Sequence, residues 1–311
     1  MKIVFMGTPD FAVPCLRVLA ENGHEVAGVF TQPDKPKGRG YKMIPTPVKA
    51  AAQEYGIPVY QPLSLRKGED AAAAMETLKA LEPELIVVVA YGQILPKEIL
   101  ELPKHHCINI HASLLPAYRG AAPIQWSVLN GETKTGVTSM LMAEGLDTGD
   151  MLLRAETEID GDESADSLHD RLSEMGAKVL LDTVAAIENG TLNPEPQDDV
   201  LSSYASRITK EMSQLDFAKP AQVLHNTIRG ITGFTALEGK RLKIYASKVV
   251  KLHGADALEN GAVADAEQFT VKCGDGMGLR LTEIQPEGKK RMKTEDYLRG
   301  KKLEEGTILG L

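Results

Sequence analysis

The feature that most constrains the fold is an alternation of short apolar runs with segments of helical periodicity. The clearest run, residues 85–90, is almost entirely Ile and Val and is apolar on both faces of an extended chain. Strands of this kind, spaced by helices, are typical of a parallel sheet that helices cover on both sides. We therefore predict a Rossmann-like α/β fold, with strands over residues 2–6, 26–31, 85–90, 107–110, 135–142 and 151–158 and helices over 11–21, 47–55, 71–81 and 164–188.

The pattern changes after residue 189. Residues 190–205 contain Gly, Asn, Pro and Asp without periodicity and are interpreted as an interdomain linker. Beyond them we expect a helix over 219–229 and short alternating strands, which are typical of a small antiparallel barrel, here OB-like. These strands are expected over 241–250, 269–273 and 277–282. The predicted organisation is an α/β domain over 1–189, a linker over 190–205 and a C-terminal β-barrel domain over 206–311.

Charge is distributed unevenly along the chain. The formal net charge of −8 taken alone disfavours an anionic partner. Residues 206–311, however, hold 18 Lys plus Arg against 14 Asp plus Glu, so that region is basic and the remainder is acidic. Such a split is either ordinary solvated surface or the footprint of a nucleic acid. Two basic clusters are candidates for phosphate contacts: a Gly-containing loop with Lys35, Lys37, Arg39 and Lys42, and a run of Lys289, Lys290 and Arg291.

Several classes of function are disfavoured by motifs that the sequence lacks. The turn after the first predicted strand has no G-x-G-x-x-G spacing, and Pro9 and Asp10 stand where a dinucleotide would need free N–H groups. Without a P-loop or an H-E-x-x-H motif, we expect neither nucleotide hydrolysis nor a bound metal. The three cysteines are far apart and form no CxxC pair, which fits a reducing compartment. No apolar stretch suits a signal peptide or membrane helix, so we expect a cytoplasmic protein.

Polar side chains follow the strand predicted over residues 107–110. Asn109 and His111 are two residues apart, so in an extended chain they face the same side while Ile110 points into the core. Asp147 lies in a Gly-containing loop between two edge strands, which we expect at the same end of the sheet. The alternatives are a structural histidine and an aspartate used for turn chemistry. An amide and an imidazole on one strand face, followed by a turn, favour a functional site.

At these residues the chain resembles the folate-dependent formyltransferases. The resemblance rests on Asn109 and His111, on the run Ser113-Leu114-Leu115-Pro116 and on Asp147 downstream. Longer runs resemble the branch of that family that formylates methionyl-tRNA, and they cover nearly the whole chain: 5–12, 29–36, 38–40, 118–125, 145–151, 168–172, 208–211, 219–220 and 289–292. Two positions depart from the family pattern: Ala117 replaces a usual basic residue, and residues 230–234 replace a usual Asn-Pro-Trp-Pro-Gly segment.

The resemblance implies an enzyme that transfers a formyl group from 10-formyltetrahydrofolate to the amino group of initiator methionyl-tRNA. Asn109 would then donate to the developing oxyanion, His111 would assist there or in proton transfer, and Asp147 would orient the imidazole. Folate contacts are expected at Ser113, Leu114, Leu115, Pro116, Tyr91, Gln93 and Ile94. Contacts to tRNA are expected at Arg39, Lys35, Lys37, Lys42, Lys289, Lys290 and Arg291, with the 206–311 domain binding the tRNA.

Two other interpretations belong to different functional classes. One is a formyltransferase or formylfolate hydrolase with the same core that acts on a small molecule, and the basic loop and basic second domain argue against it. The other is a non-catalytic RNA-binding protein, which would make Asn109, His111 and Asp147 incidental. Under the main interpretation we expect no metal and a monomeric protein.

Overall fold

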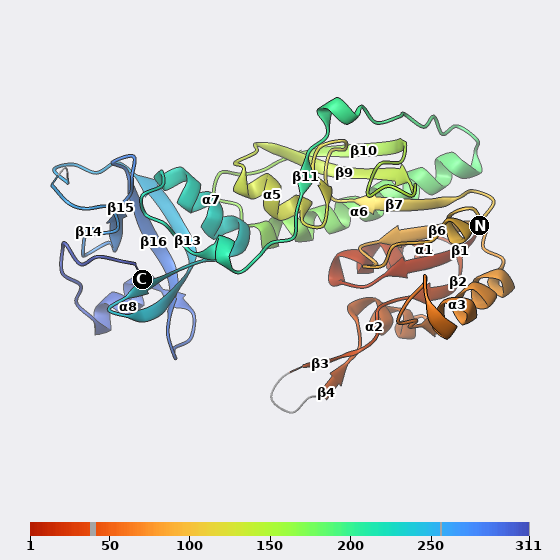
Figure 1. The fold of residues 1–311 in the computed structure, drawn as a ribbon, viewed down its shortest axis with the longest axis horizontal. Helices are drawn as coiled ribbons and strands as arrows, with labels where there is room; N and C mark the ends of the chain where they lie inside the picture. Colours follow the sequence, from red (N-terminus) through yellow and green to blue (C-terminus); the bar gives the residue numbers. More distant parts are fainter. Residues whose placement is uncertain (38–41, 256, 311) are drawn as a thin grey trace. The chain divides into compact units, whose positions relative to one another are not determined.

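The computed structural model describes residues 1–37, 42–255 and 257–310, and its chain forms two compact units (Figure 1). The chain passes between the units more than once, so neither unit is a single stretch of sequence. The prediction of separate domains over 1–189 and 206–311 stays a prediction. Unit 1 comprises Met1–Gly120, Thr135–Thr157 and His169–Ala205, and unit 2 comprises Ala121–Lys134, Glu158–Leu168 and Ser206–Leu311.

Unit 1 is built on a sheet whose strands are β1 (Lys2–Gly7), β2 (Glu25–Phe30), β5 (Val59–Tyr60), β6 (Leu85–Val89), β7 (Cys107–His111), β9 (Lys134–Leu141) and β10 (Met151–Glu158). Their order across the sheet is β10-β9-β7-β6-β1-β2-β5. The pairs from β5 to β7 are all parallel, and β9 runs antiparallel to β7. The predicted, mostly parallel sheet is therefore confirmed, and β7 is the strand at which the pairing changes direction.

Helices cover both faces of this sheet. They are η1 (Asp10–Ala12), α1 (Val13–Glu21), α2 (Pro47–Glu54), α3 (Gly68–Leu81), α4 (Lys97–Leu100) and α6 (Ala165–Glu188). On one face, Leu78 of α3 packs in one cluster with Val4 and Ile86 of the sheet. On the other face, α6 approaches β7 so closely that a Cβ on Gly176 would lie 3.1 Å from Ile110 Cγ2. Burial from both sides explains why every residue of β6 is buried and why its sequence is continuously apolar.

Two helices begin two residues later than predicted, and each has a proline at or next to its first residue. The helix predicted over 11–21 begins as the short η1 turn, and α1 starts at Val13 with Pro14 in its first turn. The helix predicted over 219–229 is α7 (Ala221–Ile231), and Pro220 is its N-cap residue. Proline lacks an N–H and has a fixed φ, so it suits the first turn of a helix and marks its beginning.

Unit 2 contains a second sheet, made of β12 (Gly233–Leu237), β13 (Lys240–Val250), β14 (Val263–Asp265), β15 (Thr270–Lys272), β16 (Gly278–Pro286) and β17 (Met292–Lys293). Its strands pair antiparallel, which confirms the predicted antiparallel second sheet. Leu224 and Ile228 of α7 pack in one core with Ile244 of β13. Closure into an OB-like barrel stays a prediction. Unit 2 also holds α5 (Pro123–Leu129), η3 (Glu211–Ser213) and α8 (Thr294–Gly300).

The segment predicted as a linker, residues 190–205, makes regular contacts within unit 1. Glu195 forms an isolated antiparallel bridge with Met151. Farther along, β11 (Tyr204–Ala205) pairs in parallel with β8 (Arg119–Gly120), and the short helix η2 (Asp199–Leu201) precedes it. The sequence predicted none of these elements, because they are short and lack an apolar period.

Gly149 lies in the loop between β9 and β10, two residues before β10, and a substitution there tests how closely this loop is packed. A Cβ at this position would stand 1.8 Å from the carbonyl oxygen of Leu141, so the main chain would have to move. We expect Gly149→Ala to lower the free energy of unfolding by about 1–3 kcal/mol, measured by urea denaturation. Gly300→Ala is the matched control, because a Cβ there meets no atom within 4 Å. Equal stability of both variants and the parent would contradict the packing.

Candidate active site

Asn109 and His111 reach the same face of β7, as the sequence alternation predicts. Asn109 lies opposite Met140 of β9, and His111 lies opposite Thr138. Ile110 points to the opposite face against α6 and is buried. Because β6 and β7 are parallel, the carboxyl ends of both strands meet at this edge of the sheet, where α/β proteins place their ligand sites.

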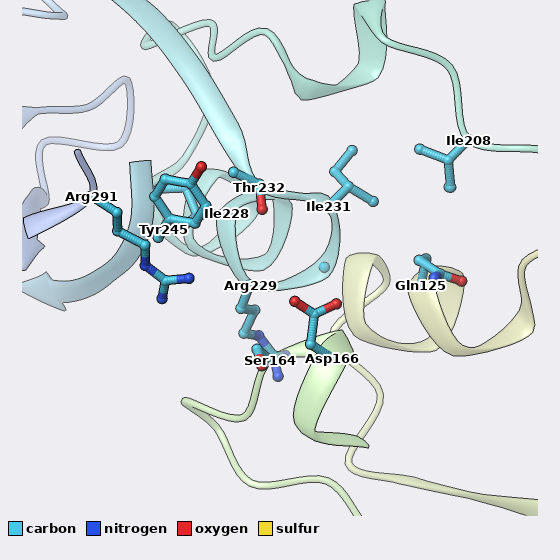
Figure 2. A pocket seen from close by; sticks show the side chains of 11 residues that line it. Gln125, Ser164, Asp166, Ile208, Ile228, Arg229, Ile231, Thr232, Tyr245 and Arg291 are labelled. Atoms are coloured by element: carbon cyan, nitrogen blue, oxygen red, sulfur yellow. The ribbon is translucent and has the colours of Figure 1, made fainter. Parts of the chain in front are cut away.

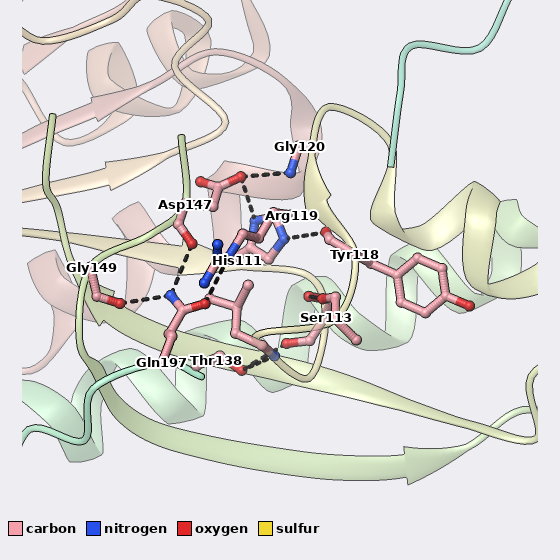
Figure 3. Close-up of polar contacts among 11 residues, drawn as sticks. His111, Ser113, Tyr118, Arg119, Gly120, Thr138, Asp147, Gly149 and Gln197 are labelled. Carbon is pink, nitrogen blue, oxygen red and sulfur yellow. Dashed lines mark hydrogen bonds and ion pairs between the residues drawn. The ribbon is translucent and has the colours of Figure 1, made fainter. Parts of the chain in front are cut away.

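The imidazole of His111 is buried and held from two sides (Figure 3). Its Nε2 lies 2.9 Å from the carbonyl oxygen of Tyr118; that oxygen can only accept, so Nε2 carries a proton. Its Nδ1 lies 3.7 Å from Oδ2 of Asp147, and this oxygen accepts the backbone N–H of Gly120 at 2.8 Å. A separation of 3.7 Å is too long for a hydrogen bond, but catalytic contacts often tighten around substrate. The structure thus brings His111 and Asp147 together.

Asn109 differs from His111 in that its side chain has no hydrogen-bond partner among the described residues. It is half-buried, and within the described residues its amide makes no hydrogen bond. An ordered amide on the same strand face as an anchored imidazole can donate to an oxygen of a bound molecule. These three side chains can therefore supply a hydrogen-bond donor, a proton carrier and a carboxylate that orients it. Their catalytic roles stay predictions.

Comparison with known proteins identifies the family. The sequence profile of formyl transferases matches residues 1–184, and that of the formyl transferase C-terminal domain matches residues 207–302. The chain belongs to the formyl transferase family. A protein of Alkaliphilus oremlandii named methionyl-tRNA formyltransferase is 50% identical over 100% of both chains. The Bacillus subtilis protein of the same name is 48% identical, over 100% of this chain and 98% of its own.

A solved structure supports the fold of this formyl transferase independently. The sugar 3N-formyl transferase WlaRD, determined in the presence of dTDP and 5-N-formyl-THF, superimposes with a TM-score of 0.68. The alignment covers 93% of this chain and 99% of WlaRD, and the two sequences are 21% identical. At that identity the likeness concerns the fold, which the two proteins share across both units.

The run that resembles a family folate site forms a tight loop after β7. Ser113 is fully buried; its hydroxyl donates to the carbonyl of Ala117 at 2.7 Å, and its own carbonyl accepts from Thr138 at 2.7 Å. Leu115 is also buried, in a cluster with Met140. Leu114 and Pro116 are half-buried. The side chains of Ser113 and Leu115 thus shape the loop from inside, and only Leu114 and Pro116 offer side-chain surface to a ligand.

The second segment expected to contact folate follows β6. Most of its side chains are buried or hydrogen-bonded within the protein. Tyr91 is 1% exposed, burial raises the pKa of its hydroxyl, and its carbonyl accepts from Thr8 at 2.8 Å. Gln93 accepts the N–H of Leu65 at 2.8 Å and donates to a neighbouring carbonyl. Ile94, in contrast, is exposed. Of these three residues, Ile94 has the side chain that is open to a ligand, while Tyr91 and Gln93 build the loop that carries it.

The basic loop of unit 1 is partly described. Its strands β3 (Lys35–Lys37) and β4 (Lys42–Ile44) pair antiparallel. Lys35 is exposed. Arg39 lies outside the described residues, as do the side chains of Lys37 and Lys42.

The basic run of unit 2 combines exposed and paired charges. Lys289 and Lys290 are exposed in the turn before β17. Arg291 is 2.6 Å from Glu283, and its guanidinium lies over the ring of Tyr245 at 4.2 Å from the centroid. The hydrogen bond from Arg291 lowers the pKa of the Glu283 carboxyl. Arg291 is therefore already paired with a carboxylate, whereas neither lysine forms an ion pair within the described part of the chain.

Unit 2 also contains a cavity of about 290 Å³ that the sequence did not indicate (Figure 2). Arg229, which lines it, is buried and donates to the carbonyls of Asp160 at 3.2 Å and Glu163 at 3.3 Å. It also contacts the Val128 carbonyl at 3.5 Å. These bonds join three separate stretches of unit 2, so Arg229 has a structural role there. Other side chains around the cavity include Asp166, Tyr245 and Arg291.

Across residues 1–37, 42–255 and 257–310, no group of three or more His, Cys, Asp or Glu side chains is placed to hold a metal ion. In the same residues, no helix is both long and apolar enough to cross a membrane.

Proposed function

We propose that this protein transfers the formyl group of 10-formyltetrahydrofolate to the amino group of initiator methionyl-tRNA, forming the formylmethionyl-tRNA used in translation initiation. The observation that carries the proposal is the match of the whole chain, with the segments of both units, to relatives named methionyl-tRNA formyltransferase. The amide, imidazole and carboxylate at the carboxyl edge of the sheet support it chemically.

Asn109 is the proposed oxyanion donor. Formyl transfer to an amine is acyl transfer, so the formyl oxygen gains negative charge in a tetrahedral intermediate. The side-chain N–H of Asn109 has no other partner among the described residues and can donate to that oxygen. The neutral amine is a sufficient nucleophile, so no covalent enzyme intermediate is needed. The cysteine thiols suit that role poorly, since burial raises the pKa of Cys15, Cys107 and Cys273 to about 12.

His111 is proposed to assist the proton transfer from the attacking amine to the leaving folate nitrogen. Its Nε2 donates to Tyr118 and its Nδ1 faces Asp147, so one of these contacts must give way when the ring exchanges a substrate proton. Asp147 then keeps the ring oriented and stabilises the imidazolium that forms during the transfer. This division of roles needs no metal ion.

Exposed basic residues are the proposed contacts to the tRNA phosphates. Lys35 in unit 1 and Lys289 and Lys290 in unit 2 are on the surface, where lysine can approach a phosphate. Arg39 offers a planar fork for phosphate or base edges. We further propose that the protein acts as a monomer in the cytoplasm, where its tRNA substrate is found. The remaining proposed contacts are Lys37, Lys42 and Arg291.

A salt series tests the tRNA substrate. With about six phosphate contacts, doubling the salt from about 100 to 200 mM should weaken tRNA binding about 40-fold, because each contact releases counterions. We expect KM for methionyl-tRNA to rise accordingly at saturating folate. The Kd of the folate, measured separately by fluorescence titration, should change little over the same range.

The same assay distinguishes the alternatives. Formylation of a small amine that is insensitive to salt, with no reaction on methionyl-tRNA, would favour a small-molecule formyltransferase. Release of formate without an acceptor would favour a hydrolase. Binding of tRNA without folate binding would favour a non-catalytic RNA-binding protein.

A further inference from the structure

Residues 195–205 of unit 1, named here the strap, lie next to the two groups that flank the His111 imidazole. These groups are the carbonyl of Tyr118 and the carboxylate of Asp147. The strap begins at the bridge between Glu195 and Met151 and ends in β11, which pairs with β8. Between these ends it contacts the loop of Asp147 through Gln197 (Figure 3) and the loop of Tyr118 through Ser203. The strap is therefore anchored at both ends, and its middle lies against the two loops that hold His111.

Gln197 of the strap fixes the loop of Asp147. Its Nε2 donates to the carbonyl of Asp147 at 2.9 Å and to the carbonyl of Gly149 at 2.7 Å. Asp147 has φ +53°, a left-handed conformation that residues with a side chain adopt rarely. Backbone in this region persists where its surroundings determine it. The two bonds from Gln197 hold the main chain on both sides of residue 148 and so fix the direction of the Asp147 carboxylate.

Ser203 of the strap fixes the other partner, the carbonyl of Tyr118. Its hydroxyl accepts the N–H of Tyr118 at 2.8 Å, and its carbonyl accepts the N–H of Arg119 at 2.8 Å. Tyr118 also has a left-handed backbone, with φ +60°. The peptide group that presents its carbonyl to Nε2 of His111 is thus bonded on both flanks to Ser203.

Arg119 links the part of the strap that contains Gln197 to the loop that Ser203 holds. Its Nε donates to Oε1 of Gln197 at 2.9 Å, and its guanidinium lies 2.8 Å from the Asp199 carboxylate in the strap. The amide of Gln197 is thereby oriented, because its oxygen accepts from Arg119 and its nitrogen must face the two carbonyls. Both groups that flank the His111 ring therefore depend on one network, to which the strap contributes Gln197, Asp199 and Ser203.

We propose that Gln197 and Ser203 are positioning residues for His111. They hold the Asp147 carboxylate and the Tyr118 carbonyl in place and so set the orientation of the imidazole. In the described part of the chain neither side chain hydrogen-bonds to the ring, so each acts through one of the groups beside it. The inference rests on the proposed function only for its kinetic readout, because the orientation of the ring can be observed without turnover.

Gln197→Glu is the sharpest variant. Glutamate retains an acceptor for Arg119, so the strap keeps that anchor, but it replaces the N–H donors by an oxygen that repels the carbonyls of Asp147 and Gly149. We expect kcat for formyl transfer to fall by about 10- to 100-fold, as is typical when a supporting contact moves a catalytic group. KM for the folate and the melting temperature should stay close to those of the parent. Gln197→Met, which has similar length and no hydrogen bonds, serves if the glutamate variant does not fold.

Two variants of Ser203 test whether its hydroxyl is required for activity, and a variant elsewhere in the strap serves as the control. Ser203→Ala removes the acceptor for Tyr118 and should lower kcat, while Ser203→Thr keeps the hydroxyl and should restore it. Val200→Ser is the matched control in the same strap, because this side chain is 89% exposed. We expect it to retain parent activity.

The decisive readout is the Nε2–H signal of His111 in ¹⁵N-histidine NMR of the protein without substrate. Its assignment comes from the signal lost in His111→Gln. In the parent, the bond to Tyr118 should slow exchange of this proton with water; in Gln197→Glu and Ser203→Ala exchange should accelerate and the signal should shift. An unchanged signal in both variants would overturn the proposal, as would a loss of kcat accompanied by an equal loss of folate binding. If the parent protein failed to formylate methionyl-tRNA, the proposed function would fall, while the NMR result would still decide the positioning role.

Discussion

Replacing Asn109 with alanine should lower kcat for formyl transfer by about 10²- to 10³-fold, the usual cost of losing one oxyanion donor. The effect should appear in kcat and kcat/KM together, because the bond to the formyl oxygen strengthens only as charge develops. Binding of the folate in the ground state should change little. Single-turnover kinetics with saturating folate and methionyl-tRNA measure the chemical step directly.

The stability of this variant should be close to that of the parent. Asn109 is half-buried, and its amide has no hydrogen-bond partner in the described chain, so truncation breaks no bond within the protein. Asn189→Ala is the matched control, since that side chain is exposed directly after the last residue of α6. Turnover of Asn109→Ala within a few-fold of the parent would remove Asn109 from the mechanism.

The sheet of unit 1 shows which parts of the fold the sequence can predict. Strand β6 is predicted to within one residue, because a run of Ile and Val buried on both faces has one simple interpretation. Strand β5, Val59–Tyr60, is not predicted: it has two half-buried residues, and its place is set by pairing with β2, far away in the sequence. The same holds for β8 and β11, whose residues become strands only through each other.

The sequence also predicts some features of the candidate site and not others. The alternation in β7 predicts that Asn109 and His111 share a face, because side-chain direction is a local property of a strand. The groups that hold the His111–Asp147 pair are the carbonyl of Tyr118 and the N–H of Gly120. Every residue has a carbonyl, and nearly every one has an N–H, so no residue type marks these partners in a sequence.

The sequence also does not predict that the side chain of Ser113 points into the protein. The family resemblance implies a folate contact there, yet the hydroxyl closes a loop on Ala117, and Thr138 binds both the Ser113 carbonyl and the N–H of Leu115. A short polar residue in a turn bonds to nearby backbone as readily as to a ligand. A motif therefore identifies the loop at a site more securely than it identifies which side chains of that loop touch the substrate.

His111→Ala and Asp147→Asn should each lower kcat by about 10²- to 10⁴-fold, the range for loss of an acid–base group. His111→Ala removes the proposed proton carrier. Asp147→Asn keeps the size of the side chain, but an amide nitrogen cannot accept the N–H of Gly120, and an amide oxygen carries no charge for the imidazolium. Steady-state kinetics at fixed pH measure both effects, with circular dichroism as a check on folding.

The double variant tests whether the two residues act as a unit. In the proposed mechanism Asp147 acts on the substrate only through the ring of His111, which lies 3.7 Å away, so its contribution to the rate should vanish once the ring is gone. We therefore expect His111→Ala with Asp147→Asn to be about as slow as His111→Ala alone, as in other catalytic groups that work together. Losses that multiply would mean that Asp147 acts on the substrate independently, and the division of roles between a proton carrier and its orienting carboxylate would have to be abandoned.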